Sequence, residues 1–148
     1  MGQRSKFLGL LALVLAACSS NNREEYLLGE WYNESLRVDI DALDGTPDSI
    51  FSVPAGQWEE ILQIQPIRTT YKADGTYESV YTELDGTLLQ KTSGQWALKG
   101  DSLFLTSQGL TTSYYFEWKG GKGLFEGFLD WDTDGKSDDF YSGVQIKK

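Results

Sequence analysis

Turn-forming residue pairs recur along the chain at short and regular intervals, and this spacing limits the folds open to it. The intervals are about 8 to 14 residues, which suits hairpins that follow one another directly. Asp-Gly supplies the positive φ angles that a tight hairpin turn needs. The turns are Asp74-Gly75, Asp85-Gly86, Gly100-Asp101, Gln108-Gly109, residues 119–123 and Asp134-Gly135. The spacing therefore predicts a series of antiparallel hairpins.

The segments between these turns are rich in residues that favour strands. In one of them, Leu110, Tyr114 and Phe116 fall on one face of a strand, while Thr111 and Tyr115 fall on the other. No segment has the period of a long amphipathic helix. We expect strands at residues 28–40, 61–71, 76–83, 87–98, 102–106, 110–118, 124–129 and 140–147.

About eight short-turn strands can remove their exposed edges by closing on themselves. We therefore expect an all-β fold, a single up-and-down antiparallel barrel, with a two-sheet β-sandwich as the alternative. An eight-stranded interior is just wide enough to be filled by side chains or to hold one small ligand. Residues 41–60 interrupt the rhythm with two prolines and several acids, and they predict a long loop with a short strand or turn near 50–53.

The beginning of the chain predicts export. Arg4 and Lys6 precede an apolar run over residues 7–17, which is shorter than the roughly 20 residues that span a bilayer. The run ends in Leu15-Ala16-Ala17-Cys18 and resembles the lipobox of bacterial lipoprotein signal peptides. That resemblance implies a signal peptide over 1–17, lipidation of Cys18 and a membrane anchor; an ordinary secretory signal is the alternative. Polar residues 18–25 would form a tether, and 26–148 the barrel domain.

The amino-acid composition limits which partners, metal sites and catalytic groups the protein can have. The chain has 13 basic and 22 acidic side chains, and removal of Arg4 and Lys6 with the leader would change its formal charge from −9 to −11. Such a charge disfavours nucleic acid as a partner. Histidine is absent and Cys18 is the only cysteine, so serine–histidine triads and zinc sites with imidazole or thiolate ligands are excluded. We expect a non-enzymatic protein whose natural metals are hard cations.

Four short motifs resemble those of bacterial lipocalin-like lipoproteins. They are Gly29-Glu30-Trp31, the segment 71–77 with Asp-Gly-Thr-Tyr, Gly94-Gln95-Trp96 and Gly100-Asp101-Ser102-Leu103. The resemblance implies a lipocalin-like barrel with Trp31 across its closed end. The arginine that lipocalins place over this tryptophan has no counterpart in residues 140–148, where only Lys147 and Lys148 are basic.

The same resemblance implies a ligand site under residues 41–60, which would form a lid over the barrel mouth. Phe51 and Trp58 would line the entrance, with Tyr114 and Phe116 on the inward face of their strand. In the alternative interpretation, Phe51 and Trp58 fold onto the core as a hydrophobic plug.

The acidic segment 130–139 follows one predicted strand and precedes another, which makes it a hairpin loop. Its spacing, Asp130-x-Asp132-x-Asp134-Gly135-x-x-Asp138, is typical of calcium loops, in which alternate carboxylates converge. The predicted ligands are Asp130, Asp132, Asp134, the backbone carbonyl of Lys136, and Asp138; Asp139 lies outside the pattern. Strand flanks and Tyr141 at position 12 exclude an EF-hand. The alternative is a solvated acidic turn.

Two functions follow. The first is a lipid-anchored cell-envelope protein that binds a small apolar or amphipathic ligand in its barrel. The second is an interaction or inhibitor module with a filled barrel that calcium would stabilise, and its partner would be an envelope protein. Ser19 after the cysteine is compatible with sorting to the outer rather than the inner membrane. An enzyme that uses a carboxylate pair has little support in the spacing.

Overall fold

The computed structural model describes residues 23–43 and 45–148. The predicted signal peptide, Cys18 and most of the predicted tether lie outside these residues. The elements are α1 (Arg23–Leu27), β1 (Gly29–Ile40), β2 (Ser49–Val53), α2 (Trp58–Leu62), β3 (Arg68–Tyr71), β4 (Thr76–Thr82), β5 (Leu88–Lys99), β6 (Ser102–Ser107), β7 (Leu110–Lys119), β8 (Lys122–Leu129) and β9 (Asp139–Lys147). None of the helices in the described ranges is long and apolar enough to cross a membrane.

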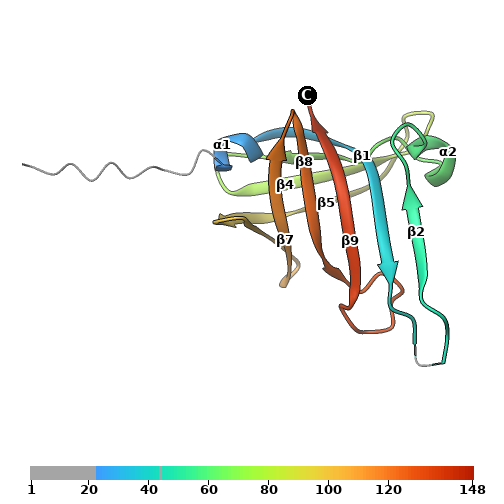
Figure 1. Cartoon of the computed structure of the whole chain (residues 1–148). Coiled ribbons are helices and arrows are strands. Elements are labelled where there is room, and N and C mark those ends of the chain that lie inside the picture. Colours follow the sequence, from blue (N-terminus) through green and yellow to red (C-terminus); the bar gives the residue numbers. More distant parts are fainter. Residues whose placement is uncertain (1–22, 44) are drawn as a thin grey trace, which may run out of the picture.

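The strands form one antiparallel sheet that closes on itself. Neighbours along the chain pair from β3 to β9, and β1 pairs with β9 over Trp31–Lys147 to Asp39–Phe140. The other edge of β1 is shared: its first residues pair with β3 and its last residues with β2. The result is an eight-stranded up-and-down barrel with β2 as an extra strand beside β1 (Figure 1). The predicted all-β barrel is thus confirmed, and the sandwich is not formed.

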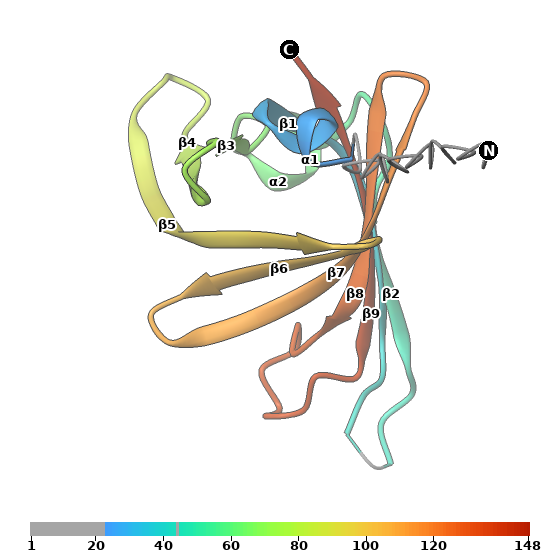
Figure 2. The same cartoon turned by 90° about the vertical axis from the view of Figure 1, so that its left-hand side faces the viewer.

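The two ends of the barrel differ in what covers them. The β1–β2, β4–β5, β6–β7 and β8–β9 connections lie at one end, because consecutive strands run antiparallel. The other end carries α1 and the C-terminus, and Figure 2 shows α1 lying over it while the β6–β7 and β8–β9 turns extend away. We call these the open and closed ends.

Aromatic side chains fill the closed end. Trp31 is fully buried, and its ring meets Phe116, Trp118 and Phe125 edge-on at centroid distances of 6.0, 5.4 and 5.8 Å. Such pairs contribute about 0.5–1.5 kcal/mol each beyond their buried area. A Cβ on Gly123 would lie 2.7 Å from the Trp31 ring, so this position needs glycine. The indole N–H of Trp31 donates to the Leu27 carbonyl at 2.7 Å, which ties α1 to the core.

A lysine occupies the place that the sequence leaves without an arginine. The Lys147 ammonium lies 5.8 Å from the centroid of the Trp31 ring and donates to the Tyr26 carbonyl at 3.0 Å. The last strand therefore does supply a cation over the first tryptophan.

The expected strand over 61–71 is wrong in its first half. Trp58–Leu62 is helical, an isolated bridge joins Ile64 to Glu83, and β3 begins only at Arg68. The helix lets Trp58 bury its ring to 3% exposure while its N–H donates to the Gln65 carbonyl at 3.3 Å. The short strand expected near 50–53 is present as β2. Residues 23–25, assigned to the tether by composition, are helical.

Candidate functional site

A cavity of about 700 Å³ occupies the barrel at its open end. Every barrel strand contributes to its wall, together with Trp58 from α2 and Trp131 from the β8–β9 loop. This volume lies in the range of about 300–1,000 Å³ that is typical of small-molecule sites. The barrel is therefore hollow above its aromatic closed end.

The wall of this cavity is mixed in polarity, and none of the described residues that line it is charged. Its polar members other than tyrosine are Asn33, Thr69, Ser79, Gln90, Thr92, Ser107, Gln108, Thr112 and Gln145. Its aromatic members are Tyr71, Tyr77, Tyr81, Tyr114, Tyr141, Trp58, Trp131 and Phe125. Aliphatic residues supply the rest, namely Leu36, Ile67, Leu105, Leu110 and Leu129. Rings and neutral hydrogen-bonding groups thus alternate around one space.

The tyrosines of the wall keep their protons. Burial raises the pKa of Tyr114 to about 12, with smaller contributions from Tyr81 and Tyr77. Burial also raises the pKa of Tyr71 and of Tyr141 well above the ordinary value. At neutral pH each hydroxyl is therefore an uncharged group that can both donate and accept a hydrogen bond.

Two buried amides lie opposite each other where the cavity meets the aromatic core. Asn33 on β1 pairs in register with Gln145 on β9, and their exposed fractions are 7% and 9%. The Gln145 Oε1 atom is buried and accepts no hydrogen bond from residues 23–43 or 45–148. Tyr141, two strand positions before Gly143, extends along β9 over that glycine, where an added Cβ would collide with the tyrosine ring. An acceptor without a donor thus faces a space lined by polar groups.

Of the four residues predicted to bind a ligand in the barrel, two line the cavity and two do not. Trp58 and Tyr114 line the cavity. Phe51 does not: it lies on β2 with its ring 5.8 Å from that of Trp131. Phe116, 1% exposed, belongs to the closed-end core, because it lies one inward position further along β7 than Tyr114. The described part of residues 41–60 does not form a lid in one piece, since β2 extends the sheet beside β1 and, of these residues, Trp58 of α2 lines the cavity.

The Asp-rich segment is the β8–β9 loop, and hydrogen bonds curl it. Asp130 Oδ2 accepts from the Gly135 N–H at 3.1 Å, Asp132 Oδ1 from the Asp134 N–H at 3.1 Å, and Asp134 Oδ1 from the Lys136 N–H at 2.8 Å. These bonds turn alternate carboxylates toward the inside of the loop.

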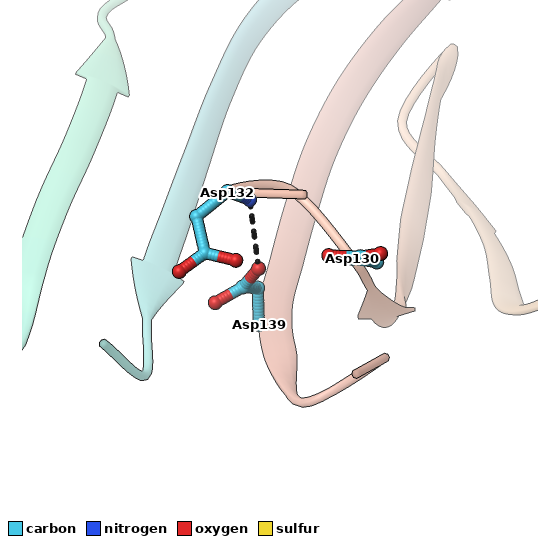
Figure 3. A group of neighbouring side chains, drawn as sticks. All are labelled: Asp130, Asp132 and Asp139. Carbon is cyan, nitrogen blue, oxygen red and sulfur yellow. Dashed lines mark hydrogen bonds between the residues drawn. The ribbon is translucent and has the colours of Figure 1, made fainter. Parts of the chain in front are cut away.

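Asp139, the first residue of β9, holds this loop to the barrel. It is fully buried, and its carboxylate accepts hydrogen bonds from the N–H groups of Asp41, Trp131 and Asp132 at 2.9, 2.6 and 3.2 Å. Figure 3 shows its side chain pointing toward Asp132, with Asp130 to one side. Carboxylate oxygens of Asp130, Asp132 and Asp139 all lie within 4.8 Å of one another. This cluster can hold a metal ion.

The cluster differs from the ligand set read from the loop pattern. Asp130 and Asp132 are common to both, whereas Asp139 was left out because it lies beyond position 9 of the pattern. Asp139 takes an inward position at the start of β9, and the calcium-loop spacing does not take strand position into account. Lys136 lies beside the site, with its ammonium 3.8 Å from Asp134 Oδ2.

Asp134 and Asp138 are the remaining predicted ligands, and each has a buried oxygen that accepts no hydrogen bond from the described residues. The Asp134 side chain is 3% exposed, and neither its Oδ2 nor the Oδ1 of Asp138 has a hydrogen bond. Burial, and then the charges of Asp134 and Asp41, raise the pKa of Asp138. Lys136 offsets part of this negative charge, and a bound cation would offset more of it.

No model of a known protein family matches the chain, and no curated protein matches it either. The barrel, the cavity and the carboxylate cluster are therefore the observations from which function is argued.

Proposed function

We propose that this is a lipid-anchored, non-enzymatic protein of the cell envelope that binds a small amphipathic ligand inside its barrel. The observation that carries the proposal is the cavity of about 700 Å³ with its mixed, uncharged wall. A space of this size closed at one end can enclose most of the surface of a small molecule. The interaction-module alternative depends on a filled barrel, and the cavity favours binding over it.

The lining supports binding rather than catalysis. General acid–base chemistry needs a group whose pKa lies near the working pH. The cavity wall contains no aspartate, glutamate, lysine or arginine, the chain has no histidine, and the wall tyrosines Tyr71, Tyr114 and Tyr141 hold their protons above neutral pH. These groups can orient a ligand through hydrogen bonds and ring contacts.

The binding proposal is tested by native mass spectrometry of the full chain purified from its own envelope in mild detergent. We expect an adduct of small-molecule mass that dissociates at raised collision energy. Thr112→Trp, which fills the cavity from β7, should remove the adduct, and Thr111→Trp, on the exposed outer face of the same strand, should keep it. Wild-type protein that carries no adduct, and that gains none on incubation with an envelope lipid extract, contradicts the proposal.

The anchor is proposed from Cys18 and the apolar run before it. Two or more acyl chains hold a protein firmly on a bilayer, whereas one chain does not. We expect wild type in the membrane fraction, with the outer membrane favoured by Ser19, and Cys18→Ser in the soluble fraction. Mass spectrometry of the mature N-terminus should show a diacylated or triacylated cysteine. An unmodified Cys18 in membrane-bound protein would exclude this anchor.

A second candidate function, calcium binding that stabilises the β8–β9 hairpin, is favoured by the unpartnered buried oxygens of Asp134 and Asp138. Ca²⁺ takes six to eight oxygen ligands, often carboxylates. Asp130, Asp132 and Asp139 would form one side of the site, and Asp134 and Asp138 of the same loop would supply the remaining carboxylates. Its role would be to fix the loop beside Trp131 in the cavity wall.

Thermal melting in chelator and in millimolar calcium tests this candidate. Calcium at 100 times its Kd should add about 2.7 kcal/mol to the free energy of unfolding. Asp132→Ala should abolish the response. Asp85→Asn alters another Asp-Gly turn, where the carboxylate accepts from the Thr87 N–H at 2.8 Å, and should leave the response intact. A wild-type melting temperature that ignores calcium contradicts the site.

A further inference from the structure

The chemistry of the cavity wall carries the binding proposal further, to the class of ligand. We propose that the cavity takes an uncharged ligand bearing hydroxyl groups, and that one of these hydroxyls donates a hydrogen bond to Oε1 of Gln145. This inference rests on the proposed ligand-binding function.

The absence of charge from the wall selects against ions. A carboxylate that enters the cavity loses its hydration, and no wall residue offers a counter-charge. Lys147, on the same face of β9 as Gln145, is held at the closed end by the Tyr26 carbonyl and the Trp31 ring. At the open end, Trp131 of the wall belongs to the same loop as the acidic cluster, so an anion would also approach negative charge.

The polar groups of the wall select against purely apolar molecules. Gln145 is 9% exposed and its Oε1 lacks a donor, and a buried acceptor left unsatisfied is costly. Some other wall groups satisfy one another, such as Thr69 and Ser79 at 2.8 Å. The Gln145 acceptor therefore marks the place where a ligand hydroxyl is missing, and an alkyl chain cannot supply it.

The aromatic groups give such a ligand its apolar contact. Tyr114 and Tyr141 meet edge-on with their ring centroids 6.1 Å apart, and Tyr71 and Tyr77 lie 6.2 Å apart. These rings present flat surfaces for the carbon skeleton, and their protonated hydroxyls add donors and acceptors to the same cavity wall as Gln145. Both a monoacylglycerol and an alkyl glycoside have the chemistry that this wall fits.

Three probes separate these requirements, each used below its critical micelle concentration. Monolauroylglycerol and laurate share one acyl chain and differ in charge and in hydroxyl groups, and octyl glucoside carries its hydroxyls on a ring. Binding is measured with the full-length protein by isothermal titration calorimetry and by the fluorescence of the wall tryptophans Trp58 and Trp131. We expect at least one neutral probe to bind tenfold or more tightly than laurate, and the stronger of the two identifies the ligand type.

Two substitutions and one control variant test which residues set the preference for the neutral probes over laurate. Gln145→Met keeps the length of the side chain and removes the acceptor, so it should weaken the neutral probe three- to tenfold without affecting laurate. Gln95→Met makes the same change at an exposed position of β5 that does not line the cavity, and should leave binding of every probe unchanged. Thr112→Lys adds a cation to the wall and should bring laurate binding to at least the level of the neutral probe.

The outcomes distinguish this inference from the proposal on which it rests. Laurate binding to wild type as tightly as both neutral probes leaves the binding function standing and overturns the ligand class. Unchanged affinity in Gln145→Met, with the folded state verified by circular dichroism, overturns the role of Gln145. Failure of all three probes, together with no adduct in native mass spectrometry, overturns both proposals.

Discussion

On the inward face of β7, Phe116 packs against Trp31 at the closed end, while Thr112 and Tyr114 of the same strand line the cavity. The last strand changes in the same way, from Lys147 over Trp31 to Gln145, Tyr141 and the buried carboxylate of Asp139 at the open end. The same strands thus form a packed aromatic closed end and a hollow open end with polar groups in its wall. The contrast teaches that core packing and cavity lining fall at different positions along each strand rather than on different strands.

Loss of the closed-end aromatic packing should have the largest effect. Phe116→Ala should lower the free energy of unfolding by about 3–5 kcal/mol, because it opens a void beside Trp31. Thr112→Ala, on the same face of β7, should cost less than about 1 kcal/mol, since its side chain already borders empty space. Urea unfolding measures both. Equal losses would mean that the two halves of the barrel share one packed core.

Loss of the buried carboxylate at the open end should come next. Asp139→Ala leaves the N–H groups of Asp41, Trp131 and Asp132 without their acceptor, and should cost about 2–4 kcal/mol in chelator. Asp134→Ala, whose carboxylate accepts a single N–H from Lys136, should cost about 1 kcal/mol or less. If the order is reversed, Asp139 does not hold the loops together.

Alkaline titration should then separate the cavity tyrosines from exposed ones. Burial raises the pKa of Tyr114 to about 12 in the folded protein, so between pH 10 and 12 only the unfolded chain loses this proton. Stability must therefore fall as pH rises through that window, by up to about 2 kcal/mol from Tyr114 at pH 12. Tyr114→Phe should flatten the fall, and Tyr26→Phe, 43% exposed, should not. Denaturant unfolding between pH 9 and 12 provides the measurement.

The cation at the closed end should have the smallest effect. Lys147→Met keeps the alkyl stem over Trp31 but removes the charge and the bond to the Tyr26 carbonyl, and should cost about 0.5–1 kcal/mol. Lys119→Met, at the exposed end of β7, is the control and should be neutral. Denaturant unfolding that finds no difference between the two variants would make Lys147 an ordinary surface lysine.

Much of the fold is predictable because hairpin turns and alternation are local properties. Asp74-Gly75 and Gly100-Asp101 do connect paired strands, as the spacing predicts. The segment 61–67 misled the prediction because its isoleucines and glutamines alternate like a strand, whereas burial of Trp58 favours one helical turn ending at Gln63 with φ 56°. Tertiary packing decides such short segments, and a two-residue period does not carry that information.

The site was less predictable, because it depends on which side chains turn inward and which distant strands pair. Whether an aromatic-rich barrel is filled depends on which rings turn inward and at what depth: Phe128 is 60% exposed while Phe116 is buried. The unpaired acceptor of Gln145 exists only because β9 pairs with β1, which lies far away in the sequence. The loop pattern found Asp130 and Asp132 but not Asp139, because it counts positions within the loop and Asp139 acts from the adjoining strand.

The helix α1 joins the closed end through the Leu27 carbonyl, the Trp31 indole and the stacked rings of Tyr26 and Trp118. Arg23, where the described chain begins, therefore lies at the closed end of the barrel, opposite the cavity entrance. If the proposed anchor at Cys18 holds the protein on a membrane, the closed end of the barrel faces that membrane. Its rim, with the acidic β8–β9 loop and Trp131, then faces the aqueous compartment, so a ligand enters from solution rather than directly from the bilayer beneath.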